Sequence, residues 1–158
     1  MLVYLLLKRI KKDFLPRLSS LAIFVFLVLF AFGTTHFYVG TLGSTWHVNQ
    51  MTTSFLATLG IYVIFKKERT IKDYLFSSII ISLALLGRFT IVMLLTLPVF
   101  LYLFEKHKSL KNFFLIFGLP LIFFVLLSFS YNYLRFGHPL EYGYSYIKEA
   151  PYLAQIRE

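Results

Sequence analysis

The stretch Phe113–Leu134, which reads F-F-L-I-F-G-L-P-L-I-F-F-V-L-L-S-F-S-Y-N-Y-L, contains no charged residue. As a helix it is about 33 Å long, enough to cross the hydrocarbon core of a bilayer, which is about 30 Å thick. In the whole chain 58% of residues are hydrophobic and only 15% are charged. A soluble domain is about half apolar and about a quarter charged. We therefore predict an all-α fold, a polytopic bundle of transmembrane helices.

The basic residues are grouped in short clusters between apolar runs, at 8–17, 66–72 and 106–111, and the net charge is +9. Clusters of this kind are typical of topology signals in membrane proteins, whereas a nucleic-acid surface gathers its cations on one face. We predict no nucleic-acid partner. The chain has no cysteine, which excludes disulfides, thiolate metal sites and a cysteine nucleophile.

The segment Tyr74–Phe104 is interrupted only by Arg88, and its length allows two interpretations. As a single helix it is about 46 Å long and would need a tilt of about 50°, beyond the usual range. As two passes it gives helices of about 21 Å and 24 Å, which are both short. Length alone does not decide between one pass and two.

Charge favours two passes, because only then do all three basic clusters lie on the cytoplasmic side. The predicted short hairpin then turns at Gly87–Arg88 on the far side of the membrane. Five spans result: Leu18–Val39, Val48–Phe65, Tyr74–Gly87, Phe89–Phe104 and Phe113–Leu134. The prediction is an integral, multi-pass protein of the plasma membrane, with extracytoplasmic loops at 40–47, 87–88 and 135–158. The predicted divisions are a basic interfacial start (1–17), a transmembrane domain (18–134) and an outer loop and tail (135–158).

Two arginines on the predicted outer side, Arg88 and Arg135, are candidate ligands of a lipid-linked phosphate. A cation beside apolar segments needs an anion, a headgroup or a water-filled cavity. Guanidinium matches phosphate bidentately, which favours a substrate role. The alternative for both is anchoring at the membrane interface. Glu141 is a weak candidate for a catalytic base, and the alternative is a local ion-pair partner.

Several kinds of chemistry have no support in the sequence. The nucleotide-binding patterns G-x-x-x-x-G-K-[ST] and G-x-G-x-x-G and the hydrolase patterns H-E-x-x-H and G-x-S-x-G are all absent. His36, His47 and His138 lie near the predicted outer interface without paired carboxylates, so no metal site is predicted. We expect no cofactor.

The segment Asn132–Tyr144, N-Y-L-R-F-G-H-P-L-E-Y-G-Y, resembles the N-x-x-R-F-G-x-P-x-x-x-G-Y segment of polytopic type-C glycosyltransferases of the protein-mannosyltransferase-like and lipid-A-sugar-transferase-like groups. Two weaker similarities are the segment 86–98, with Arg88 at a turn, and the small-residue loop 43–47. The resemblance implies transfer of a sugar from a polyprenyl-phosphate donor on the outer face, with inversion at the sugar carbon. The loop-motif positions that it marks are Asn132, Phe136, Gly137, Pro139, Gly143 and Tyr144.

The chain departs from that family at the catalytic acid. Members carry essential acidic residues, often Asp, in the first large outer loop, whereas the predicted loop 40–47 contains no acid. The resemblance therefore supplies substrate-side candidates, Arg88 and Arg135, but no catalytic residue. Three interpretations follow: a glycosyltransferase or an inactive fragment of one, a non-catalytic membrane scaffold or interaction protein, and a small transporter. The last would need ionisable residues within spans, and Arg88 is its one candidate.

Overall fold

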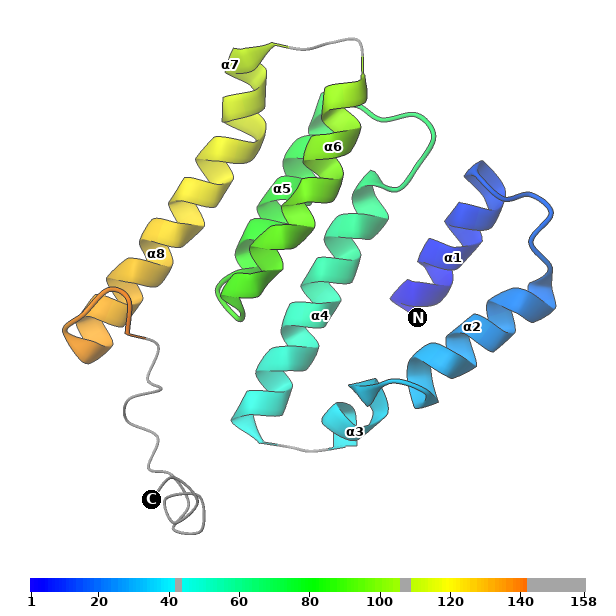
Figure 1. The fold of residues 1–158 in the computed structure, drawn as a ribbon, viewed down its shortest axis with the longest axis horizontal. Coiled ribbons are helices and arrows are strands. Elements are labelled where there is room, and N and C mark those ends of the chain that lie inside the picture. Colours follow the sequence, from blue (N-terminus) through cyan, green and yellow to red (C-terminus); the bar gives the residue numbers. More distant parts are fainter. Residues whose placement is uncertain (42–43, 106–108, 142–158) are drawn as a thin grey trace, which may run out of the picture. The chain divides into compact units, whose positions relative to one another are not determined.

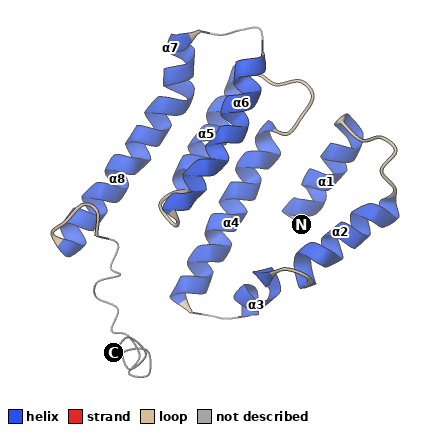
Figure 2. Cartoon of the chain, viewed as in Figure 1, coloured by secondary structure: helices blue, strands red, loops and turns tan. Residues whose placement is uncertain are grey.

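The computed structural model describes residues 1–41, 44–105 and 109–141, and every regular element in these ranges is a helix (Figures 1 and 2). The predicted all-α class is confirmed. The chain divides into two compact units, Met1–Phe124 and Val125–Glu158. In the described ranges, Leu110–Phe136 is the one helical segment long and apolar enough to cross a membrane.

The first unit is organised around the close packing of α4 (Thr45–Ile64) against α5 (Ile71–Ala84). The buried face of α4 carries small residues at helical spacing, Thr53, Ala57 and Gly60. Ser77 of α5 lies against this face, and its hydroxyl donates to the Gly60 carbonyl at 2.9 Å. Small side chains let two helix backbones approach closely, as in helix pairs within lipid.

A helical hairpin occupies 74–104, as predicted, whereas the crossing of a membrane by both of its arms stays a prediction. α5 ends at Ala84, and after a turn the chain continues as a 3-10 segment, Phe89–Leu95, and then as α6 (Thr96–Phe104). Tyr74 near the start of α5 contacts Tyr102 near the end of α6, so the two arms are antiparallel. The turn ends at Gly87 and Arg88 follows it, so the two arms are connected at the predicted tip.

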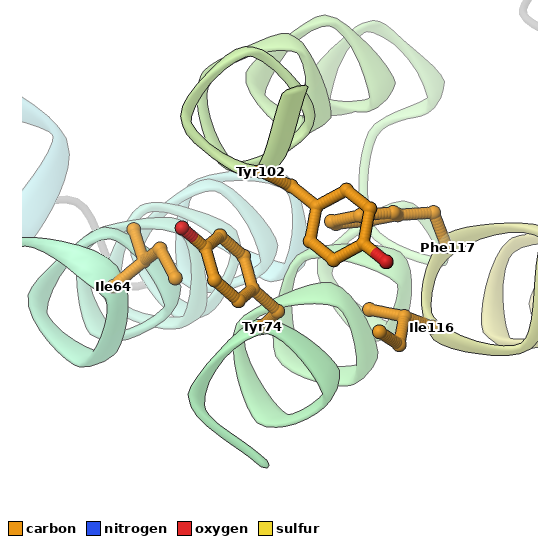
Figure 3. Packing of buried hydrophobic residues seen from close by; sticks show 5 residues of the cluster. All are labelled: Ile64, Tyr74, Tyr102, Ile116 and Phe117. Carbon is orange, nitrogen blue, oxygen red and sulfur yellow. The ribbon is translucent and has the colours of Figure 1, made fainter. Parts of the chain in front are cut away.

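An aromatic cluster joins one end of this hairpin to its neighbours (Figure 3). The ring centroids of Tyr74 and Tyr102 are 5.3 Å apart in an edge-to-face arrangement, and Phe117 lies 5.6 Å from Tyr102 and 6.3 Å from Tyr74. Ile64 and Ile116 complete the buried set. Edge-to-face pairs add to the stabilisation that burial of the rings provides.

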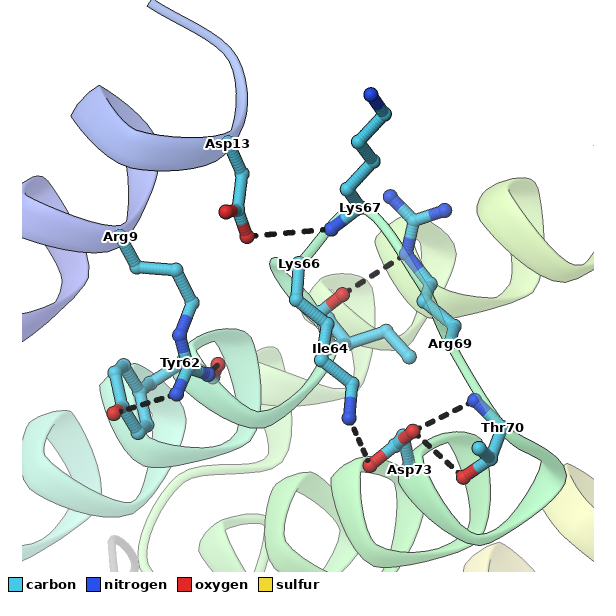
Figure 4. A network of polar contacts seen from close by, with 9 residues as sticks. All are labelled: Arg9, Asp13, Tyr62, Ile64, Lys66, Lys67, Arg69, Thr70 and Asp73. Atoms are coloured by element: carbon cyan, nitrogen blue, oxygen red, sulfur yellow. Dashed lines mark hydrogen bonds and ion pairs between the residues drawn. The ribbon is translucent and has the colours of Figure 1, made fainter. Parts of the chain in front are cut away.

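Polar contacts fix the connection between α4 and α5 (Figure 4). Arg69 donates to the Ile64 carbonyl at 3.0 Å and forms an ion pair with Glu105 at 3.3 Å. Glu105 also accepts from the Tyr74 hydroxyl at 2.6 Å, so one carboxylate holds the loop and both hairpin arms.

Asp73 closes a capping box with Thr70 at the start of α5. The same carboxylate forms an ion pair with Lys66 at 2.8 Å. Burial acts to raise the pKa of Asp73, but the hydrogen bonds from Lys66 and Thr70 outweigh it and hold that pKa below its ordinary value. Asp73 is therefore charged at neutral pH, as both the cap and the ion pair require.

The prediction of one unbroken span at Leu18–Val39 is wrong. α2 (Ser20–Phe32) ends at Gly33, and α3 (Thr35–Thr41) is a separate short helix; both follow α1 (Leu2–Asp13). Glycine is a poor helix former, and the Thr34 hydroxyl donates to the Phe30 carbonyl at 2.6 Å, competing for a main-chain acceptor. At 13 residues, α2 is about 20 Å long, less than the hydrocarbon core.

The long apolar segment predicted at Phe113–Leu134 is helical over slightly more than that range. It consists of α7 (Leu110–Phe113), a π-helical turn (Phe114–Gly118) and α8 (Leu119–Phe136). Pro120 lacks an N–H and would collide with the carbonyl four residues earlier in a regular helix, so the wider turn just before it relieves that conflict. Arg135 lies in the last turn of α8 rather than beyond it.

Candidate functional site

Arg88 follows a turn that is clamped to α4. The side-chain amide of Asn49 donates to the Gly87 carbonyl at 3.0 Å. A Cβ at position 87 would overlap the hydroxyl of Thr53, which is buried, and would lie 2.8 Å from Asn49 Oδ1. Only glycine permits this approach of the main chain to α4. Arg88 itself is in extended conformation and is the N-cap residue that precedes the 3-10 segment.

Arg88 lines a cavity of about 220 Å³ whose other walls are largely polar. α4 contributes the amide of Gln50 and the hydroxyls of Thr53 and Ser54, and Thr35 of α3 adds another hydroxyl-bearing side chain. These groups can donate hydrogen bonds to phosphate or sugar oxygens beside the guanidinium. The predicted substrate-side residue therefore lies in a cavity suited to an anionic, oxygen-rich group.

An apolar groove of about 510 Å³ shares two lining residues with this cavity, Met51 and Ser54. Its walls come from α1, α2 and α4 and include Leu27, Phe30 and Phe55. A polar cavity containing a cation and an apolar groove thus meet at the same positions of α4. This arrangement matches a molecule with an anionic head and a hydrocarbon tail.

In the second unit, the loop motif folds back on the end of α8. Gly137 has a φ of +73°, the left-handed conformation that commonly ends helices, and its N–H donates to the Tyr133 carbonyl at 2.8 Å. Asn132 is buried, and its amide donates to the Pro139 carbonyl at 3.2 Å. These three positions of the motif therefore have a local structural role. Gly143 and Tyr144 lie outside the described residues.

Arg135 is exposed and contacts aromatic residues of its own helix. Its Nη1 donates to the Tyr131 hydroxyl at 3.2 Å, and its guanidinium lies 5.0 Å from the centre of the Phe136 ring. An arginine held on aromatic rings at a helix end agrees with the anchoring alternative. The Glu141 N–H donates to the His138 carbonyl at 3.2 Å. The predicted joint action of Arg88 and Arg135, and a catalytic role for Glu141, stay predictions.

The polar residues of α4 around the cavity are not among the site residues predicted from sequence. The signal was present, because Asn49, Gln50, Thr53 and Ser54 lie inside the apolar span predicted at Val48–Phe65. Polar residues within such a span often face a cavity or another helix. In the described part of the chain, no three residues of the His, Asp and Glu types gather as metal ligands. Comparisons of the chain with protein-family models, curated proteins and solved structures find no match.

Proposed function

We propose that this chain binds the phosphate of a polyprenyl-phosphate-linked sugar through Arg88, as a multi-pass membrane glycosyltransferase or part of one. The observation that carries the proposal is the position of Arg88 in a polar cavity that shares Met51 and Ser54 with an apolar groove. The guanidinium is the phosphate ligand, the hydroxyl and amide groups of α4 contact the sugar, and the groove holds the first isoprene units.

The proposal requires the Arg88 turn to face outward. We propose five spans with Gly87–Arg88 on the extracytoplasmic side, supported by the three basic clusters that then share the cytoplasmic side. Reporter fusions after residues 88 and 140 are expected to be extracytoplasmic, and a fusion after residue 70 cytoplasmic. A cytoplasmic reporter after residue 88 would exclude the hairpin as a pair of membrane crossings and with it an outward-facing cavity.

Arg88→Gln is expected to weaken binding of polyprenyl phosphate by about tenfold, because it removes a charge-assisted hydrogen bond to phosphate. Arg88→Lys keeps the positive charge but not the forked geometry of the guanidinium, so its affinity should lie between those of wild type and Arg88→Gln. Affinity is measured on the purified full chain in detergent micelles. The matched control is Lys111→Gln, which removes one positive charge from the predicted cytoplasmic side. Equal affinities for Arg88→Gln and Lys111→Gln would refute the site.

Binding without transfer is the second candidate, and one observation favours it. Among the described residues that line the Arg88 cavity there is no Asp or Glu to act as a general base. A scaffold that holds a lipid-linked sugar would keep the Arg88 dependence of binding. It would release no polyprenyl phosphate when supplied with donor and acceptor, whereas the transferase does.

A further inference from the structure

A third hollow, of about 470 Å³, lies between α1 and the other end of α4. Four cations of α1 contribute to it: Lys8, Arg9, Lys11 and Lys12. Asp13 is the one carboxylate in its described lining, and Tyr62 of α4 forms the opposite wall. The Arg88 cavity is lined by the first half of α4, whereas Tyr62 is near its end, so this is a separate site.

Arg9 fixes α1 to α4 in this hollow (Figure 4). Its two terminal nitrogens donate to the carbonyl and the hydroxyl of Tyr62, both at 2.7 Å, and its guanidinium lies 3.8 Å from the centre of the Tyr62 ring. Because Arg9 makes all three contacts with Tyr62, its role is to position α1 against α4. The basic face of α1 is therefore held in place rather than free to turn.

Lys8 and Lys12 are one helical turn apart on α1 and line the same wall. In the described ranges the ion pairs belong to Lys66 and Arg69, and neither Lys8 nor Lys12 takes part in one. Lys67 lies close by, because its main-chain N–H donates to Asp13 at 3.4 Å, and its side chain points away from that carboxylate (Figure 4). The hollow thus has an excess of positive charge.

We infer that this hollow binds the phosphate of an anionic phospholipid headgroup, with Lys8 and Lys12 as its ligands and Arg9 as a positioning residue. One observation, one general rule and the predicted topology support this ligand. α1 is apolar from Leu2 to Leu7 and basic after it, the pattern of a helix that lies at a membrane interface. Basic pockets beside the cytoplasmic ends of membrane helices suit anionic headgroups. The hollow also belongs to the side on which the basic clusters are predicted to lie. The inference does not depend on the glycosyltransferase proposal.

Binding is measured by native mass spectrometry of the full chain released from detergent, with phosphatidylglycerol and phosphatidylcholine of the same acyl chains. Wild type is expected to retain phosphatidylglycerol preferentially. Lys8→Gln combined with Lys12→Gln should weaken that binding by about tenfold, because two charges next to the headgroup are removed. The combination Lys8→Arg and Lys12→Arg should restore it. Arg17→Gln, which removes a charge of the same cluster outside the hollow, should change it by less than about twofold.

A gain of binding provides a test that misfolding cannot imitate. Asp13→Asn removes the carboxylate from the hollow and is expected to tighten phosphatidylglycerol binding by severalfold. Equal retention of both lipids by wild type, equal effects of Arg17→Gln and the double glutamine variant, or unchanged binding in Asp13→Asn would each overturn the inference. Displacement of the lipid by millimolar inorganic phosphate would show a free-phosphate site instead of a headgroup site.

Discussion

Substitution of Gly60 by leucine is expected to destabilise the first unit by about 3 kcal/mol or more, because α4 and α5 would have to separate. Even a methyl group at this position would lie 2.5 Å from Ile81 Cγ1 and 3.2 Å from its Cδ1. Ile81 is fully buried, so its side chain has no space into which to move. The Ser77 hydroxyl bond to the Gly60 carbonyl would be lost with the same displacement.

The measurement is thermal unfolding of the purified protein in detergent, followed by circular dichroism, with alanine variants to separate sterics from helix propensity. Alanine favours a helix over glycine by about 1 kcal/mol. Gly40→Ala should therefore be neutral or stabilising, since its Cβ would meet only Met51 Cε at 3.7 Å. Gly60→Ala should be destabilising in spite of that gain. A Gly60→Leu protein as stable as wild type would show that the two helices do not pack in this way.

The second large effect is expected at Tyr74. Tyr74→Ala should cost about 3–5 kcal/mol, the range for removing a fully buried aromatic side chain. Tyr74→Phe keeps the ring and should cost about 1.5 kcal/mol, because it removes only the hydroxyl that donates to Glu105. Hydrogen bonds to charged groups contribute about 1.5–3 kcal/mol. The lower value applies here because Glu105 is partly exposed to solvent.

Tyr102 supplies the matched control. Its ring is buried in the same cluster, but its hydroxyl points away from that of Tyr74 and has no partner among the described residues (Figure 3). An unpaired buried hydroxyl is unfavourable, so Tyr102→Phe should be neutral or stabilising by up to about 1 kcal/mol. Equal destabilisation by Tyr74→Phe and Tyr102→Phe in the same unfolding experiment would contradict the arrangement of the two rings.

The sequence is informative about those parts of the fold that depend on composition and charge averaged over whole segments. Composition is sufficient for the all-α class. The balance of basic clusters favours a hairpin with its turn at Gly87–Arg88, which length alone does not, and the two membrane crossings that this balance implies stay a prediction. The end of α8 at Phe136 is close to the predicted end at Leu134, because the uncharged run ends there, directly before Arg135. The break after α2 is not predictable from hydropathy, because Gly33 and Thr34 do not interrupt the apolar run, although they are enough to end a helix.

The candidate site is less accessible from sequence, because it depends on which faces meet. Arg88 stands out as a lone cation, but its polar neighbours on α4 are recognisable only once α4 is paired with α3 and the turn. The helical spacing of the small residues on α4 can be read from the sequence. That this face packs against α5 is known only from the structure. Conversely, Asn132 and Gly137 resemble a functional motif, and the structure gives both a role in ending α8.

The turn is attached to α4 through the main chain of Gly87, one residue before the proposed phosphate ligand Arg88. The Asn49 side chain donates a hydrogen bond to the main-chain carbonyl of Gly87, and this bond does not involve the Arg88 side chain. The place of the main chain at residue 87 is thus set by Asn49 and by the lack of a side chain at Gly87. If Arg88 is the phosphate ligand, as we propose, a lineage that exchanges this arginine for another side chain would change its ligand preference, while Asn49 still holds the main chain of Gly87.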